Sequence, residues 1–533
     1  MRHSHVTTSA ILSLVVSLCM AGCESALTAA EAGQAVAPAR DSLPAQSRLG
    51  INLNGPADWN TEYPFVDVFR MSRQWISQRQ GAAWGQGPKL EHDAHGWIKR
   101  FEPGCWAETP VLTGGHAPSG DYVCLYEGEG QIEFRSSDRI VSQEPGRIVV
   151  HIEGQQGGTF LILRKTNPQN YVRNIRVIMP GFAATYQKEP FQPTFVKRWR
   201  GFNTFRFMDW MLTNGSPQKD WSDRPRPEDC NWTERGIPVE VMVDLCNRLK
   251  VNPWFCLPHQ ATDDYVRKFA ETVQRSLDPS LQTCLEYSNE VWNSGFVQNR
   301  YAQEQAKQRG LGPPERPWEG GGKYYAQRSV EIFKIWEQVF GGRQRLVRVI
   351  AWQAGGGAYW SDGIVLSHQE TYKHTDALAI APYITMCIGP SSKPNADTVA
   401  GWSLDQVLDY AESQALPECI AWMKTHKQVA DKHGLRLLAY EAGQHLVGVG
   451  GGENNEALTK LFQAANRHPR MGTIYTKYLN AWRDMGGDLM CIFASTGAWS
   501  KWGSWGLAEF MDETENDQPK FKSVMEWNRR NPR

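Results

Sequence analysis

The sequence predicts an α/β fold: a (β/α)8 TIM barrel with an all-β, sandwich-like domain inserted after the first barrel strand. Two observations lead to this prediction. From residue 202 onward, short apolar runs alternate with helical patterns. One connection between consecutive apolar runs is also far longer than an ordinary strand-to-helix link. With 533 residues, 41% of them hydrophobic and 21% charged, the chain can bury a large core and is expected to be globular.

Eight apolar runs have the length of buried strands. The first is 49–53, and 65–75 is the candidate helix that follows it. The other seven are 202–208, 251–257, 281–287, 346–352, 377–383, 435–440 and 489–493. Eight strand and helix units are the number that closes such a barrel, so the count favours this fold over an open sheet.

The long connection between the first and second runs carries the inserted domain. Five segments within it alternate or run apolar between Gly and Asn turns, as strands of an all-β domain do. They are 122–126, 131–134, 147–152, 159–163 and 172–178. We predict that 81–179 forms a β-sandwich and that 48–80 and 180–527 form the barrel. The insertion could bind carbohydrate or shape the cleft, or it could only stabilise the barrel.

The N-terminus has the features of an export signal. Arg2 supplies a positive start, and the apolar run 10–21 has signal-peptide length and is too short to span a bilayer. It ends in Cys-Met-Ala-Gly-Cys, which resembles the lipobox of bacterial lipoproteins with Cys23 as the lipidated residue. We predict a signal peptide at 1–23 and an Ala-rich tether at 24–47. The protein is then exported, either anchored to a membrane through lipid alone or secreted, for example into a periplasm.

Charge and cysteine content exclude several other classes. The 57 basic and 57 acidic side chains cancel and form no long basic run, so we expect no nucleic-acid partner. The cysteines outside the signal region lack the spacing of a zinc site, and we expect neither a metal nor an organic cofactor. Cys105 and Cys124 could pair in a disulfide. The sequence leaves the oligomeric state open.

Two carboxylates follow the predicted strands four and seven. The active site of a (β/α)8 barrel lies at the C-terminal ends of its strands. Glu290 follows the run 281–287, and Glu441 follows the run 435–440. These strands lie on opposite sides of the barrel mouth, and two carboxyl groups that face each other are what cleavage of a glycosidic bond requires. The chain also has 22 Trp, whose flat rings suit the apolar faces of sugars as well as protein cores.

The pair Asn289–Glu290 after strand four and Glu441 after strand seven resemble the catalytic residues of clan A glycoside hydrolases, nearest to family 5. The resemblance covers about 47–75 and 190–527. It implies a retaining two-carboxylate mechanism on a β-linked polysaccharide or oligosaccharide. Glu290 would then be the acid/base and Glu441 the nucleophile, which forms a covalent glycosyl-enzyme.

The resemblance also implies supporting roles for residues at other strand ends. Arg206 would keep the nucleophile ionised, and Tyr383 would donate a hydrogen bond to it. Asn289 would hold the sugar 2-hydroxyl, and His259 would line the sugar site. Asp209, three residues after Arg206, is expected to be a structural partner rather than a third catalytic acid.

The chain departs from family 5 at Ala381, where that family commonly has a His, and in its inserted domain. The resemblance therefore does not fix the substrate, and glucan, mannan and xylan stay open, as does endo or exo action. We expect Trp292 to contribute to the sugar cleft. Of the three tryptophans that follow strand eight, we favour Trp499 over Trp502 and Trp505.

Two further functions fit the same sequence. The protein could be a non-catalytic lipoprotein that binds polysaccharide at the cell surface, or it could transfer the sugar to a sugar acceptor instead of water. The distance between the two carboxyl groups distinguishes two mechanisms of glycoside hydrolysis. About 5–5.5 Å indicates retention of the anomeric configuration, and about 6.5–9.5 Å indicates its inversion.

Overall fold

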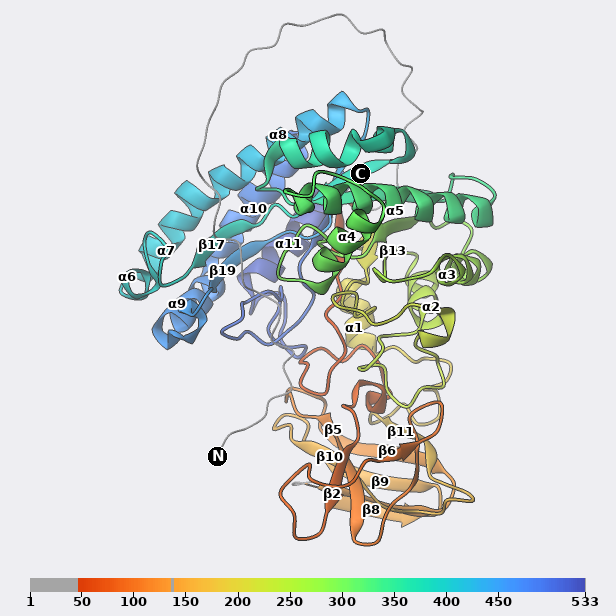
Figure 1. The fold of residues 1–533 in the computed structure, drawn as a ribbon. Coiled ribbons are helices and arrows are strands. Elements are labelled where there is room, and N and C mark those ends of the chain that lie inside the picture. The colour runs from red at the N-terminus through yellow and green to blue at the C-terminus, as the bar shows by residue number, and fades with distance from the viewer. Residues whose placement is uncertain (1–46, 136–138, 533) are drawn as a thin grey trace, which may run out of the picture.

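A computed structural model describes residues 47–135 and 139–532 (Figure 1). The predicted signal peptide, Cys23 and the tether up to residue 46 lie outside the described residues. In the described part of the chain, no helix is both long and apolar enough to cross a membrane.

Eight parallel strands close into a barrel, which confirms the predicted fold class. The last strand pairs with the first, with Gly50 beside Cys491, and so closes the sheet. The strands are buried along nearly their whole length, as expected when helices cover the outside of a parallel barrel. In barrel order they are β1 (Leu49–Asn52), β12 (Thr204–Arg206), β13 (Asn252–Leu257), β14 (Thr283–Tyr287), β15 (Leu346–Trp352), β16 (Ala377–Ile380), β18 (Arg436–Ala439) and β20 (Met490–Ile492).

Helices surround the barrel (Figure 1). They are α1 (Pro193–Trp199), α2 (Val239–Leu249), α3 (Asp263–Ser276), α4 (Val297–Gln308), α5 (Pro317–Phe340), α8 (Leu416–Lys432), α10 (Pro469–Asp484) and α11 (Pro519–Arg530). Shorter helical turns are η1 (Val68–Met71), η2 (Trp221–Asp223), η3 (Tyr359–Leu366), η4 (His368–His374), η5 (Ala411–Ala415) and η6 (Gly452–Asn454).

The prediction of a helix at 65–75 is wrong, because only the single turn η1 forms there. The segment packs on the inserted domain instead. The ring of Phe69 stacks on Trp97 at 5.9 Å, and the carboxylate of Asp67 accepts a hydrogen bond from the backbone N–H of Val177. Trp97 and Val177 are distant from this segment in the sequence, and the contacts with them override the local helical pattern.

The chain beyond strands six and seven forms an extension that the sequence pattern did not reveal. After β16 and β18 the chain continues as β17 (Ile384–Ile388) and β19 (Gln444–Gly448), which pair in parallel outside the barrel. Helices α6 (Ala396–Ala400), α7 (Leu404–Tyr410) and α9 (Glu456–Arg467) lie around this pair on the left of Figure 1.

The insertion folds into two four-stranded antiparallel sheets, with strand orders β2-β5-β10-β7 and β11-β6-β9-β8. Along β9, buried and partly exposed residues alternate, as in a sheet that covers a core with one face. The strands are β2 (Ile76–Arg79), β5 (Cys105–Leu112), β6 (Gly120–Glu127), β7 (Gly130–Arg135), β8 (Arg139–Glu144), β9 (Arg147–Ile152), β10 (Thr159–Thr166) and β11 (Arg173–Ile178), with a small hairpin of β3 (Glu91–His92) and β4 (Ile98–Arg100). The first sheet thus includes residues upstream of the expected boundary at 81. Cys105 and Cys124 are both free thiols.

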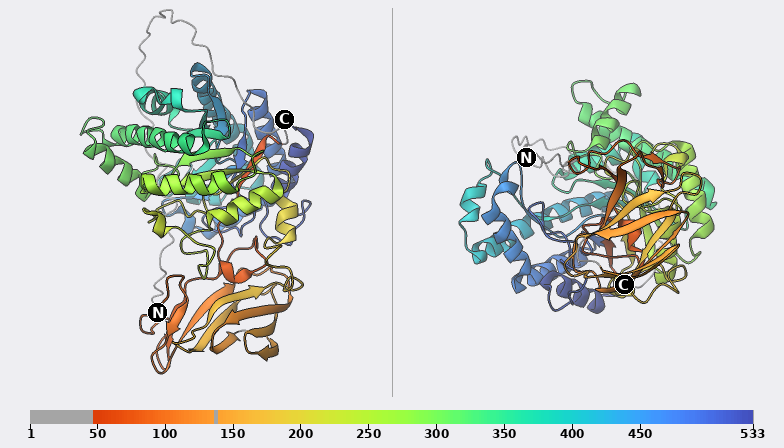
Figure 2. Two further views of the ribbon diagram at one scale, coloured as in Figure 1. Left: turned by 90° about the vertical axis from the view of Figure 1, so that its right-hand side faces the viewer. Right: turned by 90° about the horizontal axis from the view of Figure 1, so that it is seen from below.

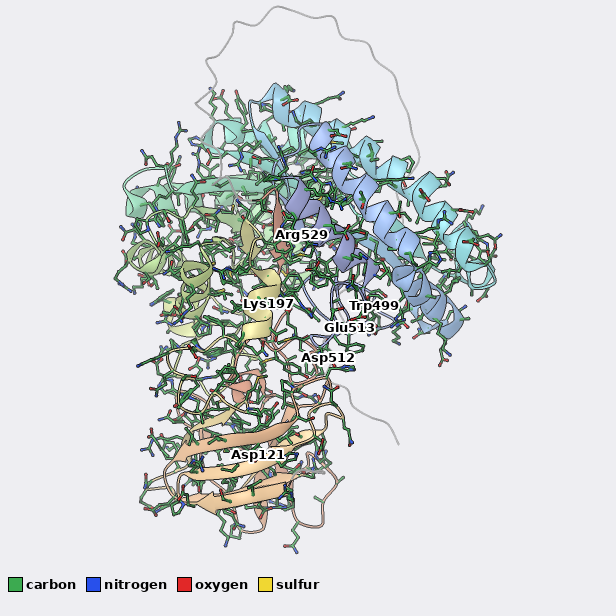
Figure 3. The ribbon with its side chains drawn as sticks, turned by 180° about the vertical axis from the view of Figure 1, so that it is seen from behind. Asp121, Lys197, Trp499, Asp512, Glu513 and Arg529 are labelled. Carbon is green, nitrogen blue, oxygen red and sulfur yellow. The ribbon has the colours of Figure 1, made fainter. Side chains whose placement is uncertain are left out.

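The inserted domain projects from one end of the barrel (Figure 2) and is fastened to the loops at the barrel mouth. The hydroxyl of Thr113 donates to Asp58 Oδ2 at 2.7 Å, in the loop after β1. The ring of His116 stacks on Phe510 at 3.7 Å and its Nδ1 lies 3.0 Å from Asp512, in the loop after β20. Figure 3 shows Asp512 between the barrel and the inserted domain. The insertion therefore adjoins the loops that build the candidate active site.

Candidate active site

The guanidinium of Arg206 organises the centre of the barrel mouth. It is fully buried at the end of β12. Its Nη1 donates to Glu441 Oε1 at 2.9 Å and to Asn52 Oδ1 at 3.0 Å. Its Nη2 donates to Asn289 Oδ1 at 2.7 Å and to Glu286 Oε2 at 3.0 Å. One side chain thus ties together the ends of strands one, two, four and seven.

Glu441 follows β18 and is held by two donors. Besides Arg206, the hydroxyl of Tyr383 donates to Glu441 Oε2 at 2.9 Å. Tyr383 comes directly before β17, where the backbone N–H of Ile384 donates to the carbonyl of Gly443. Burial, reinforced by the neighbouring carboxylates, raises the pKa of Tyr383 well above its usual range, so it stays a donor. Both contacts suit a negatively charged carboxylate.

Glu290 lies in a tight turn after β14 and has a different environment. Ser288 and Glu290 have φ values of 61° and 42°, in the left-handed region that side chains rarely adopt. The carboxyl group of Glu290 accepts hydrogen bonds from Asn293 Nδ2 at 2.9 Å and from the hydroxyl of Tyr440 at 3.4 Å. Burial raises the pKa of Glu290, and the charge of Glu441 raises it further. Glu290 is therefore suited to carry a proton while Glu441 is charged.

A chain of hydrogen bonds connects Trp292 to Glu290. The indole Nε1 of Trp292 lies 3.3 Å from the hydroxyl of Tyr440, which in turn contacts Glu290. Asn289, next to Glu290, donates from Nδ2 to Asn214 Oδ1 at 3.1 Å. Since an amide nitrogen carries two N–H groups, Asn289 can still donate one to a ligand.

His259 follows β13 and is buried. It is 2% exposed and packs edge-on against Tyr301, with ring centroids 5.1 Å apart. Both ring nitrogens are buried without a hydrogen-bond partner among the described residues. Burial lowers the pKa of His259 to about 4, which keeps the ring neutral. The described side chains around His259 leave both of its ring nitrogens unpaired, and its expected place in the sugar site stays a prediction.

The structure selects Trp505 rather than Trp499 as the tryptophan beside the carboxylates. Trp505 is partly exposed, and its ring lies 5.8 Å from Tyr383 and 4.7 Å from His445. Trp499, labelled in Figure 3, is 7% exposed, and Arg467 Cζ and Lys520 Nζ lie 4.7 Å and 4.6 Å from the centre of its ring. The spacing after strand eight does not reveal this difference, because both residues lie in an irregular loop.

Several residues of the site were missed by sequence reasoning. Glu286 is a buried partner of Arg206, and it also accepts a hydrogen bond from Trp254 Nε1 at 2.9 Å. Tyr440 directly precedes Glu441, and Asn52 ends β1. The positions of Asn52 and Tyr440 at strand ends could have indicated that they lie at the barrel mouth. Glu286 lies inside an apolar run, and such a position does not by itself indicate which residue it pairs with.

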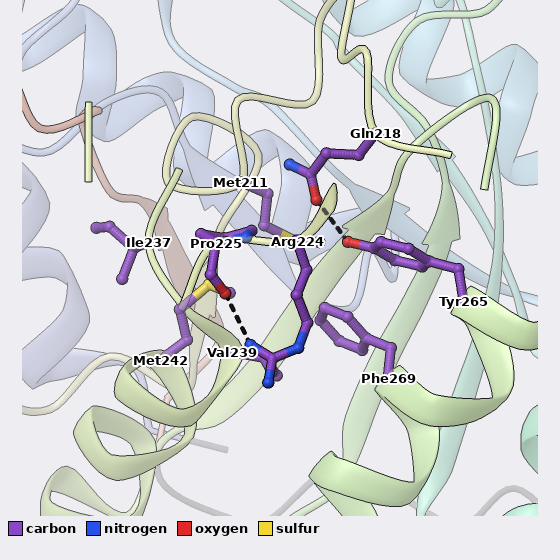
Figure 4. Close-up of a pocket in the computed structure, with 9 residues that line it drawn as sticks. All are labelled: Met211, Gln218, Arg224, Pro225, Ile237, Val239, Met242, Tyr265 and Phe269. Atoms are coloured by element: carbon purple, nitrogen blue, oxygen red, sulfur yellow. Dashed lines mark hydrogen bonds between the residues drawn. The ribbon is translucent and has the colours of Figure 1, made fainter. Parts of the chain in front are cut away.

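A separate small pocket lies beneath the loop that follows strand two (Figure 4). Its lining is mostly apolar, and its polar groups already have protein partners: the hydroxyl of Tyr265 donates to Gln218, and Arg224 donates to the carbonyl of Pro225 and pairs with Glu240. None of the catalytic candidates lines it. In residues 47–135 and 139–532, no group of three or more His, Cys, Asp or Glu is arranged to hold a metal ion.

No protein-family model and no curated protein matches the chain. Solved structures that resemble it include modules of an endo-1,4-β-D-xylanase from Clostridium thermocellum complexed with xylohexaose. That match has 9% identity and a TM-score of 0.37, and covers 88% of this chain and 97% of that chain. An endo-β-1,4-mannanase from Thermotoga petrophila has 12% identity and a TM-score of 0.33, covering 63% and 72%. A fungal β-1,4-galactanase has 10% identity and a TM-score of 0.33, covering 64% and 92%.

These neighbours are glycoside hydrolases, but TM-scores this low support no conclusion about the activity of the present chain. The resemblance to family 5 likewise stays a resemblance.

Proposed function

We propose that the protein is a retaining glycoside hydrolase that cleaves a β-linked polysaccharide or oligosaccharide. One arrangement carries the proposal: two carboxyl groups share a site in which one is held by two hydrogen-bond donors and the other is buried and has a raised pKa. Glu441 accepts from Arg206 and Tyr383. Glu290 has a raised pKa, caused first by burial and then by the charge of Glu441.

In the first step the Glu441 carboxylate attacks the anomeric carbon while Glu290 gives its proton to the glycosidic oxygen. The bond from the anomeric carbon to that oxygen breaks, the leaving sugar departs as an alcohol, and a glycosyl ester forms on Glu441. Arg206 and Tyr383 orient the attacking oxygen, and the free N–H of Asn289 is available to the sugar 2-hydroxyl.

In the second step water takes the place of the leaving sugar. Once Glu441 is an ester its charge is gone, so one of the causes of the raised pKa of Glu290 disappears. Glu290 can then accept a proton from water, which attacks the anomeric carbon and releases Glu441. One residue serves as acid and then as base.

The non-catalytic alternative is less well supported. A protein that only held glycan would have no need for a buried guanidinium that binds Glu441 or for a strained turn at Glu290. Transfer to a sugar acceptor uses the same covalent intermediate, and product analysis distinguishes it from hydrolysis. Export, with lipid attached to Cys23, stays part of the proposal, and incorporation of labelled fatty acid by wild type but not by Cys23→Ala would test it.

The proposal is tested by the release of reducing ends from β-linked glucans, mannans, xylans and galactans, with proton NMR of the first product formed. We expect cleavage of at least one polymer, with the anomeric configuration retained. Initial formation of the opposite anomer would exclude the double displacement. Binding without cleavage of any polymer would favour the non-catalytic alternative.

Replacing Trp505 and Trp499 one at a time should have different effects, the first on substrate binding and the second on stability. We expect Trp505→Ala to raise KM about ten-fold, because a partly exposed ring beside Tyr383 is placed to stack on sugar. Trp499→Ala should instead lower the unfolding free energy by about 3–5 kcal/mol, since it empties a buried site. Steady-state kinetics and thermal unfolding of both variants check this. A raised KM in Trp499→Ala alone would reverse the assignment.

A further inference from the structure

The backbone at Trp505 is anchored on both sides, although the loop after β20 is irregular. The carbonyl of Trp505 accepts a hydrogen bond from the backbone N–H of Ala494, just after β20. The preceding carbonyl, that of Ser504, accepts from Gln444 Nε2 at 2.8 Å and from Lys520 Nζ at 2.6 Å. Because Gln444 begins β19 and Lys520 belongs to α11, two elements outside the loop hold the carbonyl that precedes Trp505.

The indole of Trp505 packs closely on its own loop. Its Nε1 donates to the carbonyl of Trp502 at 3.1 Å. A β-carbon on Gly503 would lie 2.4 Å from the same nitrogen, so the ring rests against bare backbone. The ring centroid lies 4.7 Å from that of His445 and 5.8 Å from that of Tyr383. A shift of the loop backbone would therefore move the indole relative to Tyr383.

Lys520 is an unusual residue for its position. It is fully buried, and it forms no ion pair with a described residue. It also lies in the first turn of α11, where the positive end of the helix dipole disfavours a cation. Burial lowers the pKa of Lys520 well below its usual range. Burying this amine costs folding free energy, so packing alone does not account for a lysine here.

The surroundings of Lys520 indicate what its amine does. The carboxylate of Glu509, whose charge acts on Lys520, is already paired with Arg467. The ring of Trp499 lies 4.6 Å from the Lys520 nitrogen. An apolar side chain of similar length could cover that ring, whereas only a donor can hold the carbonyl of Ser504. Together with Gln444, Lys520 occupies both lone pairs of this carbonyl and so fixes its direction.

We propose that Lys520 is a positioning residue for sugar binding: its amine fixes the carbonyl of Ser504 and thereby holds the ring of Trp505 beside Tyr383. Lys520 is fully buried and does not itself touch the sugar. This inference rests on the proposed function for the role of Trp505 in binding the glycan.

The first test is Lys520→Met, which removes the donor and keeps the length of the side chain. We expect KM to rise about five-fold with kcat changed less than about two-fold, because the indole is displaced and the carboxylates are untouched. The midpoint of thermal unfolding should stay the same or rise, since an apolar side chain replaces a buried amine. A lower midpoint with an unchanged KM would make Lys520 merely structural. Lys522→Met is the matched control, because Lys522 is exposed on the same helix.

A double-mutant cycle tests whether Lys520 acts through Trp505. In the Trp505→Ala background, Lys520→Met should raise KM by less than about two-fold further, because no ring is left to position. Effects on KM that multiply in the double variant would overturn the inference. Lys520→Gln, which shortens the side chain and keeps it polar, is the second variant in the same cycle, so that the result does not depend on how well the Met variant folds.

Binding gives a readout that does not need hydrolysis. Calorimetry with Glu290→Gln, alone and combined with Lys520→Met, measures affinity for oligosaccharides of β-linked glucose, mannose, xylose and galactose. We expect the Lys520 change to weaken binding about five-fold, as it raises KM. Unchanged affinity and KM in an active enzyme would overturn this inference alone. Binding that depends on Lys520 in a wild type that cleaves nothing would overturn only the proposed function, and binding of none of these sugars would overturn both.

Discussion

Glu441→Ala is expected to lower kcat by about 10⁴-fold or more on every glycan that the wild type cleaves, because no covalent intermediate can form. The variant also leaves Arg206 without its Glu441 contact, while the contacts of Arg206 to Glu286, Asn289 and Asn52 remain. The fold should therefore persist, and circular dichroism with thermal unfolding would check this.

External azide distinguishes a lost nucleophile from a damaged site. A small anion can enter the space left by the Glu441 side chain and attack the anomeric carbon, so azide should restore turnover and give a glycosyl azide of inverted configuration. Glu456→Ala is the control, because Glu456 is an exposed glutamate on α9 whose nearest cation, Lys460, is 3.8 Å away. Full activity of Glu441→Ala would exclude it as the nucleophile.

Glu290→Gln is expected to lower kcat/KM by about 10²–10⁴-fold for natural glycans, which have poor leaving groups. Aryl glycosides with acidic phenols need little protonation, so their first step should be nearly unaffected, and the slow second step should let the glycosyl-enzyme accumulate. Rapid-quench kinetics and intact mass measurement would show this accumulation.

The pH profile gives an independent check on Glu290. The free enzyme needs a protonated Glu290, and burial with the charge of Glu441 raises its pKa above that of an ordinary glutamate. In wild type, kcat/KM should therefore fall as pH rises through this raised pKa. Glutamine does not titrate, so that alkaline limb should be absent in Glu290→Gln. An unchanged alkaline limb in the variant would assign it to another group.

The barrel could be predicted because its determinants are local. Each barrel strand is a short apolar run, and the residues that follow such runs gather at one end of a parallel barrel whatever the detailed packing. That rule alone brought Arg206, Glu290, Tyr383 and Glu441 toward one site, and the structure joins Arg206 and Tyr383 to Glu441 by hydrogen bonds.

Long-range packing explains where the expectations were wrong. The segment 65–75 has a helical pattern, yet contacts with the inserted domain hold it in another conformation. Trp499 follows strand eight as a site residue would, but it is buried, and Trp505 lies beside Tyr383 instead. The position of a residue at a strand end indicates which end of the barrel it occupies and leaves the direction of its side chain undetermined.

The sequence by itself determined the barrel class, the inserted β-domain and the two carboxylates, since periodicity and strand-end position are properties of local sequence. Only the tertiary structure decided that Trp505 rather than Trp499 adjoins Tyr383, and that Glu286 binds Arg206. These outcomes depend on which loops and strands meet in space. Contacts between residues hundreds of positions apart, such as Arg206 with Glu441, are fixed by how the whole chain packs.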